Sequence, residues 1–244
     1  MLKKIFFLCC GLFIAATFLH AQVGEQRSQW ALGVNGGVSL NKVLFTPNIR
    51  QFYQVGPVAG LTARYTSERY YGLICAIQLE ANYWRAGWNE EILSSNAVRL
   101  PDTYQRNIDY IQVPIMANLG LGEEHRGFKG FLLAGPQLSY ALSDKEIQSS
   151  QWTTHEIDGV SMADRANGIV AQYGKFIENR LDYGIVAGLG GEFTTKVGHF
   201  LVDARYYYGL SDLFHNAKKD PFSKSANNTL MLKFTYLMDF PRHK

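Results

Sequence analysis

Six charged residues lie in segments where apolar and polar residues alternate: Arg64, Glu80, Glu192, Asp203, Arg205 and Lys233. In an extended strand, alternate side chains point to opposite faces, so each of these charges shares a face with other polar or small residues. Burying an unpaired charge is very costly, and these residues are three bases and three acids. We therefore predict that the bases pair with the acids in a structural charge network inside the fold. A pathway for protons or ions is the alternative interpretation.

Few other residues have types and spacings suited to catalysis. His155 and Asp158 are close in sequence, and His215 lies in a different connection. Nothing resembles the G-x-S-x-G nucleophile elbow, and no metal-ligand or phosphate-loop motif is present. We therefore expect no enzyme activity, no catalytic residue, no metal or cofactor site and no small-molecule substrate.

The elements that position the six charges are predicted to be β-strands. The clearest is 200–213, FLVDARYYYGLSDL, in which Phe200, Val202 and Tyr206 share one face while Asp203 and Arg205 share the other. An apolar face ending in aromatic residues, opposite a polar face, is typical of a strand that spans a membrane. The same pattern predicts eight strands, at about 30–40, 55–66, 71–84, 107–119, 128–142, 181–195, 200–210 and 229–240.

The connections between these strands alternate in length. Long connections at 41–54, 85–106, 143–180 and 211–228 alternate with short ones at 67–70, 120–127 and 196–198. Bacterial outer-membrane barrels have short periplasmic turns and long extracellular loops. The predicted fold is therefore all-β, an eight-stranded antiparallel transmembrane β-barrel of the outer-membrane type with long extracellular loops, and both mature termini are predicted to be periplasmic. Pro114 lacks an N–H for the ladder, so we expect a β-bulge there.

A soluble lipocalin-like barrel or a sandwich is the alternative fold. Such folds place apolar residues inside, whereas the inward faces predicted here carry the six charges. The 14 tyrosines and 15 phenylalanines also suit the aromatic girdles of a membrane barrel. A barrel of eight strands is only wide enough for side chains to fill, so an open pore is not expected.

Residues 1–21 have the features of a secretory signal peptide. Lys3 and Lys4 precede an apolar run at 5–19, and Leu19-His20-Ala21 precedes a plausible cleavage site. An uncleaved membrane anchor is an alternative, but the run is shorter than the roughly 20 residues that a spanning helix needs. The remaining chain, 22–244, is predicted to be a single barrel domain.

Cysteine content and charge exclude several classes of protein. Cys9 and Cys10 lie early in the apolar run, which argues against a lipoprotein, and Cys75 is the one cysteine after the predicted cleavage site. A single cysteine excludes an internal disulfide and a thiolate zinc site. Acidic and basic residues nearly balance, so nothing indicates binding to nucleic acid.

The long connection 143–180 contains a candidate interaction helix. Its apolar residues Ile169, Val170, Tyr173, Phe176 and Ile177 are spaced as one helical stripe, with Ser161 as a possible cap. The stripe is expected either to pack on the mouth of its own barrel or to bind a partner protein. In the connection 211–228, Lys218, Lys219 and Lys224 are expected to be solvated, with contact to lipopolysaccharide phosphates as the alternative.

Three segments resemble the PorT family of outer-membrane β-barrel proteins. They are YIQVPIM at 110–116, GPQLSYAL at 135–142 and DARYYYGLSDL at 203–213. The resemblance implies a membrane barrel in contact with outer-membrane lipid, and a part in the type IX secretion system, which exports folded cargo such as secreted proteases. It brings no catalytic residues.

Two functions are consistent with these observations. The first is an accessory barrel of a secretion machine that docks to other subunits and is not itself the conduit. The second is a structural or adhesive surface barrel whose long loops bind an external partner.

Overall fold

The computed structural model describes residues 25–70, 72–94, 96–122, 127–157, 160–163 and 169–240. The predicted signal peptide, 1–21, lies outside these residues. Eight long strands form the body of the protein: β1 (Glu25–Thr46), β3 (Gln54–Tyr70), β4 (Leu73–Glu90), β5 (Tyr104–Gly122), β6 (Gly127–Gln148), β9 (Leu181–Thr195), β10 (Gly198–Gly209) and β11 (Lys224–Asp239). Three short strands lie in the connections: β2 (Gln51–Phe52), β7 (Thr154–Ile157) and β8 (Val160–Ala163).

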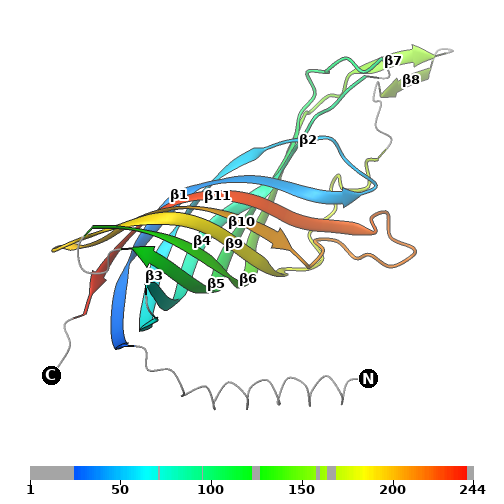
Figure 1. Ribbon diagram of the computed structural model, residues 1–244. Coiled ribbons are helices and arrows are strands. Elements are labelled where there is room, and N and C mark those ends of the chain that lie inside the picture. Colours follow the sequence, from blue (N-terminus) through cyan, green and yellow to red (C-terminus); the bar gives the residue numbers. More distant parts are fainter. Residues whose placement is uncertain are drawn as a thin grey trace, which may run out of the picture.

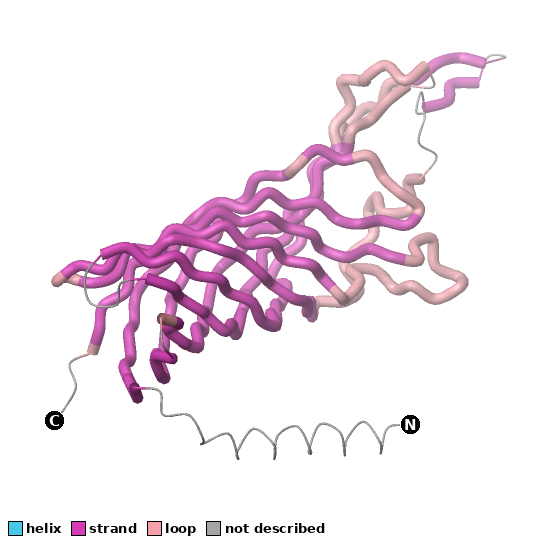
Figure 2. Tube along the Cα trace, in the orientation of Figure 1, coloured by secondary structure: helices cyan, strands magenta, loops and turns pink. Residues whose placement is uncertain are grey.

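The eight long strands close into a ring in which every strand pairs antiparallel with two neighbours (Figures 1 and 2). Around the ring the order is β1, β3, β4, β5, β6, β9, β10 and β11. The first and last strands close it, in a ladder that runs from Ala31 opposite Asp239 to Thr46 opposite Lys224. The predicted eight-stranded antiparallel barrel is therefore confirmed. In the described part of the chain, no helix has the length and apolar character needed to cross a membrane.

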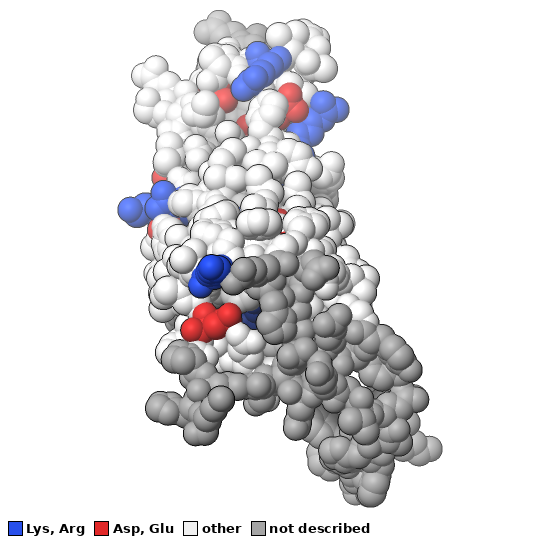
Figure 3. Space-filling model, turned by 60° about the vertical axis from the view of Figure 1, so that its left-hand side comes forward, with Lys and Arg blue, Asp and Glu red and all other residues white. Residues whose placement is uncertain are grey.

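Burial alternates along each strand as the sequence pattern predicts. On β9, for example, Leu189 is 63% exposed on the outer face, while Glu192 is fully buried in the lumen. The outward positions within 30–40, 55–65, 73–83, 111–121, 128–142, 181–195, 200–210 and 230–240 contain no Asp, Glu, Lys or Arg. Figure 3 shows a barrel wall that is mostly uncharged. This continuous apolar band is the lipid-contacting surface of a membrane barrel.

Long and short connections alternate as predicted, but the strands extend further than their apolar runs. On β1 the ladder continues to Thr46, and on β4 it continues to Glu90. The predicted turn at 67–70 lies within β3. In these extensions the pattern of apolar residues facing outward is lost, as Val43 and Phe45 of β1 are buried, while backbone hydrogen bonding between neighbours continues. We call the end with the long connections the long-loop end, and the end with the short connections the turn end.

The β-bulge predicted at Pro114 is wrong. The ladder between β4 and β5 keeps one register on both sides of Pro114, with Leu79 opposite Ile115 and Asn82 opposite Gln112. The register shift on β5 lies instead between Asp109 and Tyr110, in its ladder with β6. Proline removes a single ladder donor, which interrupts the pairing without adding a residue to the strand.

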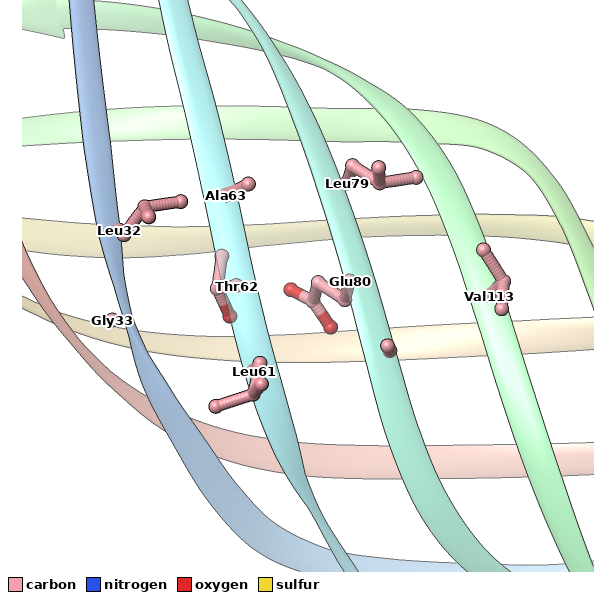
Figure 4. A pocket seen from close by; sticks show the side chains of 9 residues that line it. Leu32, Gly33, Leu61, Thr62, Ala63, Leu79, Glu80 and Val113 are labelled. Carbon is pink, nitrogen blue, oxygen red and sulfur yellow. The ribbon is translucent and has the colours of Figure 1, made fainter.

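An apolar hollow of about 350 Å³ lies in the outer wall across β1, β3, β4 and β5 (Figure 4). Its apolar lining comes from outward residues: Leu32, Leu61, Ala63, Leu79, Ala81 and Val113. The two alanines are smaller than the leucines around them, which leaves the depression. The hollow lies within the apolar band, and Gly33, Thr62 and Glu80 from the inward faces of these strands also line it.

The position of the apolar band makes a prediction about lipid contact. Leu189→Arg places a charge near the middle of the outward face of β9, and we expect it to lower the free energy of unfolding in phospholipid vesicles by about 2–4 kcal/mol. Leu210→Arg, at the end of the band, is the matched control with an expected cost of about 0–1 kcal/mol. Urea unfolding measures both, and equal costs would contradict the assigned membrane band.

Candidate functional site

Four charged side chains form a compact cluster in the middle of the lumen. Glu80 accepts hydrogen bonds from Arg205 Nη1 at 2.9 Å and Lys233 Nζ at 2.5 Å. Arg205 also pairs with Asp203 on its own strand. All four side chains are at most 2% exposed. The cluster contains two acids and two bases, so its formal charges cancel.

A second cluster surrounds Glu192 nearer the turn end. Arg64 binds it through two parallel hydrogen bonds of 2.6 and 3.0 Å, a geometry that suits a guanidinium and a carboxylate. Lys129 Nζ lies 3.0 Å and His199 Nδ1 lies 2.7 Å from Glu192 Oε1. The other ring nitrogen of His199 lies 2.9 Å from a carboxylate oxygen of Asp239.

The structure thus places all six charges singled out from the sequence in the lumen, in two clusters. Lys129 and His199 complete the second cluster, and neither was predicted to belong to the charge network. The alternation of strand residues could have identified both as inward-facing, because Lys129 follows the outward Phe128 and His199 precedes the outward Phe200. Which strands face each other across the lumen was not visible from the sequence.

Toward the long-loop end, aromatic residues fill most of the lumen, and the charged residues Asp182, Glu90 and Arg106 are buried among them. Trp84 stacks on Tyr110 at 5.1 Å between ring centroids and meets Tyr207 edge-on at 5.7 Å. Further along, Phe45 contacts Trp88 at 5.2 Å. Phe214 and Phe222, from the connection between β10 and β11, are fully buried and extend this cluster. An interior filled by paired charges and then by aromatic rings presents a packed barrier to solutes.

The segment 169–180 folds across the long-loop end. Gln172 is fully buried, and its side-chain amide donates to Glu90 at 2.8 Å. Tyr173 also donates to Glu90, at 2.8 Å, and its ring lies 4.2 Å from that of Tyr104. Arg106 donates to the backbone oxygen of Gln172 at 3.2 Å and pairs with Asp144 of β6. Side chains from the strand ends therefore bind several polar groups of this segment, while the buried side-chain oxygen of Gln172 has no hydrogen-bond partner in the described structure.

In the described residues of this connection, the predicted interaction helix is absent. The described residues 169–180 form a turn and irregular structure, and Ser161 lies in β8. Short-range spacing suggested a helix, but Gly174 adopts a positive φ of 68° and the backbone bonds to strand side chains instead. The five apolar residues are also divided: Ile169, Tyr173 and Ile177 pack against the buried core, while Val170 is 47% and Phe176 82% exposed.

The connection 210–223 packs against 169–180, and we call the two segments together the cap. Backbone N–H groups of Glu178 and Asn179 donate to the carbonyl of Leu213 at 3.1 Å. The backbone N–H of His215 donates to the Glu178 carboxylate at 2.6 Å. This hydrogen bond and the ammonium of Lys175 hold the pKa of Glu178 below its usual range. The carboxylate therefore stabilises the cap at neutral pH, and this contribution is lost as the pH falls through the lowered pKa.

The residues considered for catalysis do not meet in the described structure. His215 is exposed, and its Nδ1 lies 3.5 Å from Glu178. Asp158 and the side chain of His155 lie outside the described residues. In the described ranges, no group of three or more His, Cys, Asp or Glu side chains is arranged to hold a metal ion.

A closed ring of eight antiparallel strands, an uncharged outer band and a lumen filled with paired charges define a membrane-spanning β-barrel. A family model described as "Outer membrane protein beta-barrel domain" matches residues 20–215. The chain belongs to this family, and its location is the bacterial outer membrane. No curated protein matches it.

The chain is also similar to several solved outer-membrane proteins. The chain is 12% identical to Neisserial surface protein A, with 86% of this chain and 99% of that one covered and a TM-score of 0.42. It is 12% identical to OprG of Pseudomonas aeruginosa, with coverages of 88% and 98% and a TM-score of 0.42. Ail, the attachment invasion locus protein of Yersinia pestis, is 14% identical, with coverages of 87% and 100% and a TM-score of 0.36.

The central cluster predicts a large effect at Glu80. Glu80→Gln leaves Lys233 buried without a carboxylate partner within ion-pair distance among the described residues. We expect a loss of about 3–5 kcal/mol in the free energy of unfolding. Urea denaturation of the purified protein in detergent micelles measures the loss.

Two further variants control this experiment. Glu80→Leu combined with Lys233→Met removes both charges and is expected to recover most of the lost stability. Asp220→Asn removes a partly exposed acid from the cap and is expected to cost less than about 1 kcal/mol. An unchanged unfolding midpoint in Glu80→Gln would exclude the proposed structural role of the network.

Proposed function

We propose that this protein is an accessory subunit of a protein-secretion machine of the outer membrane, and that it acts by docking to other subunits. The observation that carries the proposal is the filled lumen. Two layers of paired charges and an aromatic layer occupy the interior of an eight-stranded ring, so a folded cargo protein has no path through it. A role in export then has to be exercised through the surfaces of the barrel and its loops.

The secretion assignment is supported by the sequence resemblance to the PorT family. The three segments that carry it fall on β5, β6 and β10, and the last one continues into the cap. These segments include residues that build the lumen, such as Tyr110, Asp203 and Arg205. The implied system is type IX secretion, with folded exported proteins as cargo and neighbouring subunits as partners.

We also propose the orientation that such a subunit would have. The long-loop end faces the outside of the cell, and the turn end, with both mature termini, faces the periplasm. The alternation of long and short connections supports this, since outer-membrane barrels keep their short turns in the periplasm. Cleavage of the signal peptide at 1–21 would leave the barrel domain at 22–244.

A structural or adhesive surface barrel is the second candidate. It is favoured by the part of the chain that stands away from the membrane band. The ends of β4, β5 and β6 project beyond the barrel, and the β7–β8 hairpin lies at the tip of this projection (Figure 1). An external ligand would meet this projection and the exposed Phe176 of the cap before it met the barrel.

Deletion of the gene separates the two functions. For a secretion subunit, we expect exported proteins to accumulate unprocessed in the periplasm while detergent sensitivity of the envelope stays normal. Immunoblotting of cell fractions measures the distribution of cargo. Normal secretion combined with loss of surface binding would overturn the secretion proposal and support the surface barrel, and a cargo-retention defect rescued by the intact gene would support secretion.

The orientation has its own test. In a Cys75→Ser background, Lys219→Cys places a thiol in an exposed part of the cap, and Lys196→Cys places one in an exposed turn at the opposite end. A membrane-impermeant maleimide should label position 219 on intact cells and position 196 only after lysis. The reverse labelling pattern would show that the barrel is inserted the other way round.

A further inference from the structure

At the long-loop end of the outer wall, the apolar band is bounded by two lysines that tyrosines hold in place. Lys42 of β1 places its Nζ 4.0 Å from the ring centroid of Tyr53. Lys224 of β11 donates to the hydroxyl of Tyr208 at 2.8 Å and lies 5.1 Å from that ring. Tyrosine is favoured at membrane interfaces, where its ring meets lipid and its hydroxyl meets water. Both ammonium groups are therefore held by tyrosines at the long-loop edge of the apolar band.

Strand pairing brings these groups into one sector of the wall. Lys42 lies opposite Asn228 of β11, and Asn228 lies opposite Tyr208 of β10. Lys224 is on the same strand as Asn228 and lies opposite Thr46 of β1. The sector thus spans β10, β11 and β1, the strands on either side of the closing ladder. We call Lys42, Lys224, Tyr53 and Tyr208 the lysine–tyrosine sector.

Neither lysine of this sector is neutralised by the part of the chain that the structure describes. No Asp or Glu in the described ranges lies within ion-pair distance of Lys42 or Lys224. The two acids of the adjoining connection are engaged elsewhere: Asp212 accepts from the backbone of Ser225, and Asp220 accepts from the backbone of Ala217.

A third cation at the edge of the band, Arg85, does have a carboxylate partner within the chain. Arg85 Nε lies 2.7 Å from Asp109, which also accepts from the hydroxyl of Tyr83 at 2.6 Å. This sector is neutral as built and needs no external anion. The contrast shows that the chain can supply a carboxylate to a cation at the edge of the band. The described part of the chain does not do so for Lys42 and Lys224.

We propose that the lysine–tyrosine sector binds the phosphate groups of lipopolysaccharide in the outer leaflet. Lysine is a common point-charge ligand for phosphate, and its apolar stem can lie along the barrel wall while its head group reaches the interface. Each lysine near an anionic membrane surface raises the affinity of a protein for that surface about fivefold. The inference rests on the proposed orientation, because this leaflet lies at the long-loop end only in that case.

The test uses the purified full-length protein in detergent micelles. Native mass spectrometry measures the binding of diphosphorylated lipid A, of the same lipid after dephosphorylation, and of inorganic phosphate. We expect the phosphorylated lipid to bind the unaltered protein and the combined variant Lys42→Gln, Lys224→Gln to bind it at least about tenfold more weakly. Heat-modified gel mobility confirms that each variant is folded.

Two matched controls define the site. Lys218→Gln with Lys219→Gln removes the same charge from exposed lysines of the adjoining connection, and we expect less than about a twofold loss of affinity. Tyr53→Leu with Tyr208→Leu keeps both charges but removes their supports, and we expect a loss comparable to that of the lysine variant. This second variant also keeps the test decisive if the lysine variant does not fold.

Three outcomes would overturn the proposal. They are equal losses from the two lysine pairs, equal binding of the dephosphorylated lipid, and displacement of the lipid by inorganic phosphate at similar concentrations. The first would show general electrostatic attraction, the second an acyl-chain contact, and the third an anion site without lipid specificity. The measurement is independent of secretion, and the cysteine-labelling experiment tests the orientation separately.

Discussion

The structure depends on the requirement that backbone polar groups be hydrogen-bonded inside a membrane. Hydrocarbon offers no partner for an N–H or C=O group, so strands can cross only as a closed ring. The ladder between β1 and β11 meets this requirement by joining the two ends of the described chain, from Ala31–Asp239 to Thr46–Lys224. Once the ring is closed, the pleat of each strand divides its side chains between lipid and lumen.

The narrow lumen then determines how its charges are arranged. Eight strands leave room for side chains only, so each inward charge is buried and needs a partner. Glu80 and Glu192 meet that need as the centres of two clusters, each drawing bases from other strands. Toward the long-loop end most inward side chains are aromatic, and Asp182 is buried among them with Asn227 as a hydrogen-bond partner. Because side chains fill the lumen, the surfaces that remain for function are the outer wall and the connections.

The cap has no helix or sheet of its own in the described residues, and side chains of the barrel hold its irregular segments in place. Acidic side chains at the strand ends accept its backbone N–H groups, as Glu146 does for Gly174 and Asp144 does for Ile177. Its apolar residues Tyr173 and Phe214 complete the aromatic cluster below. The same long-loop end carries the lysine–tyrosine sector on its outer edge. At the long-loop end, the interior is therefore filled and closed by the cap. The outer edge of the same end carries the two lysines that have no carboxylate partner in the described chain.

The sequence by itself determined the number of strands, their lipid-facing residues, the alternation of the connections and the burial of the six charges. These features follow from the two-residue period of a strand, which is local and can be read along the chain. Tertiary structure alone decided which charges meet, because Arg64 and Glu192 are brought together across the lumen by strands distant in sequence. It also decided the conformation of 169–180, where hydrogen bonds from the backbone to strand side chains replaced those of the predicted helix. It decided as well that Pro114 fits into the ladder without a β-bulge. Contacts of this kind depend on ring closure and strand register, which no short stretch of sequence contains.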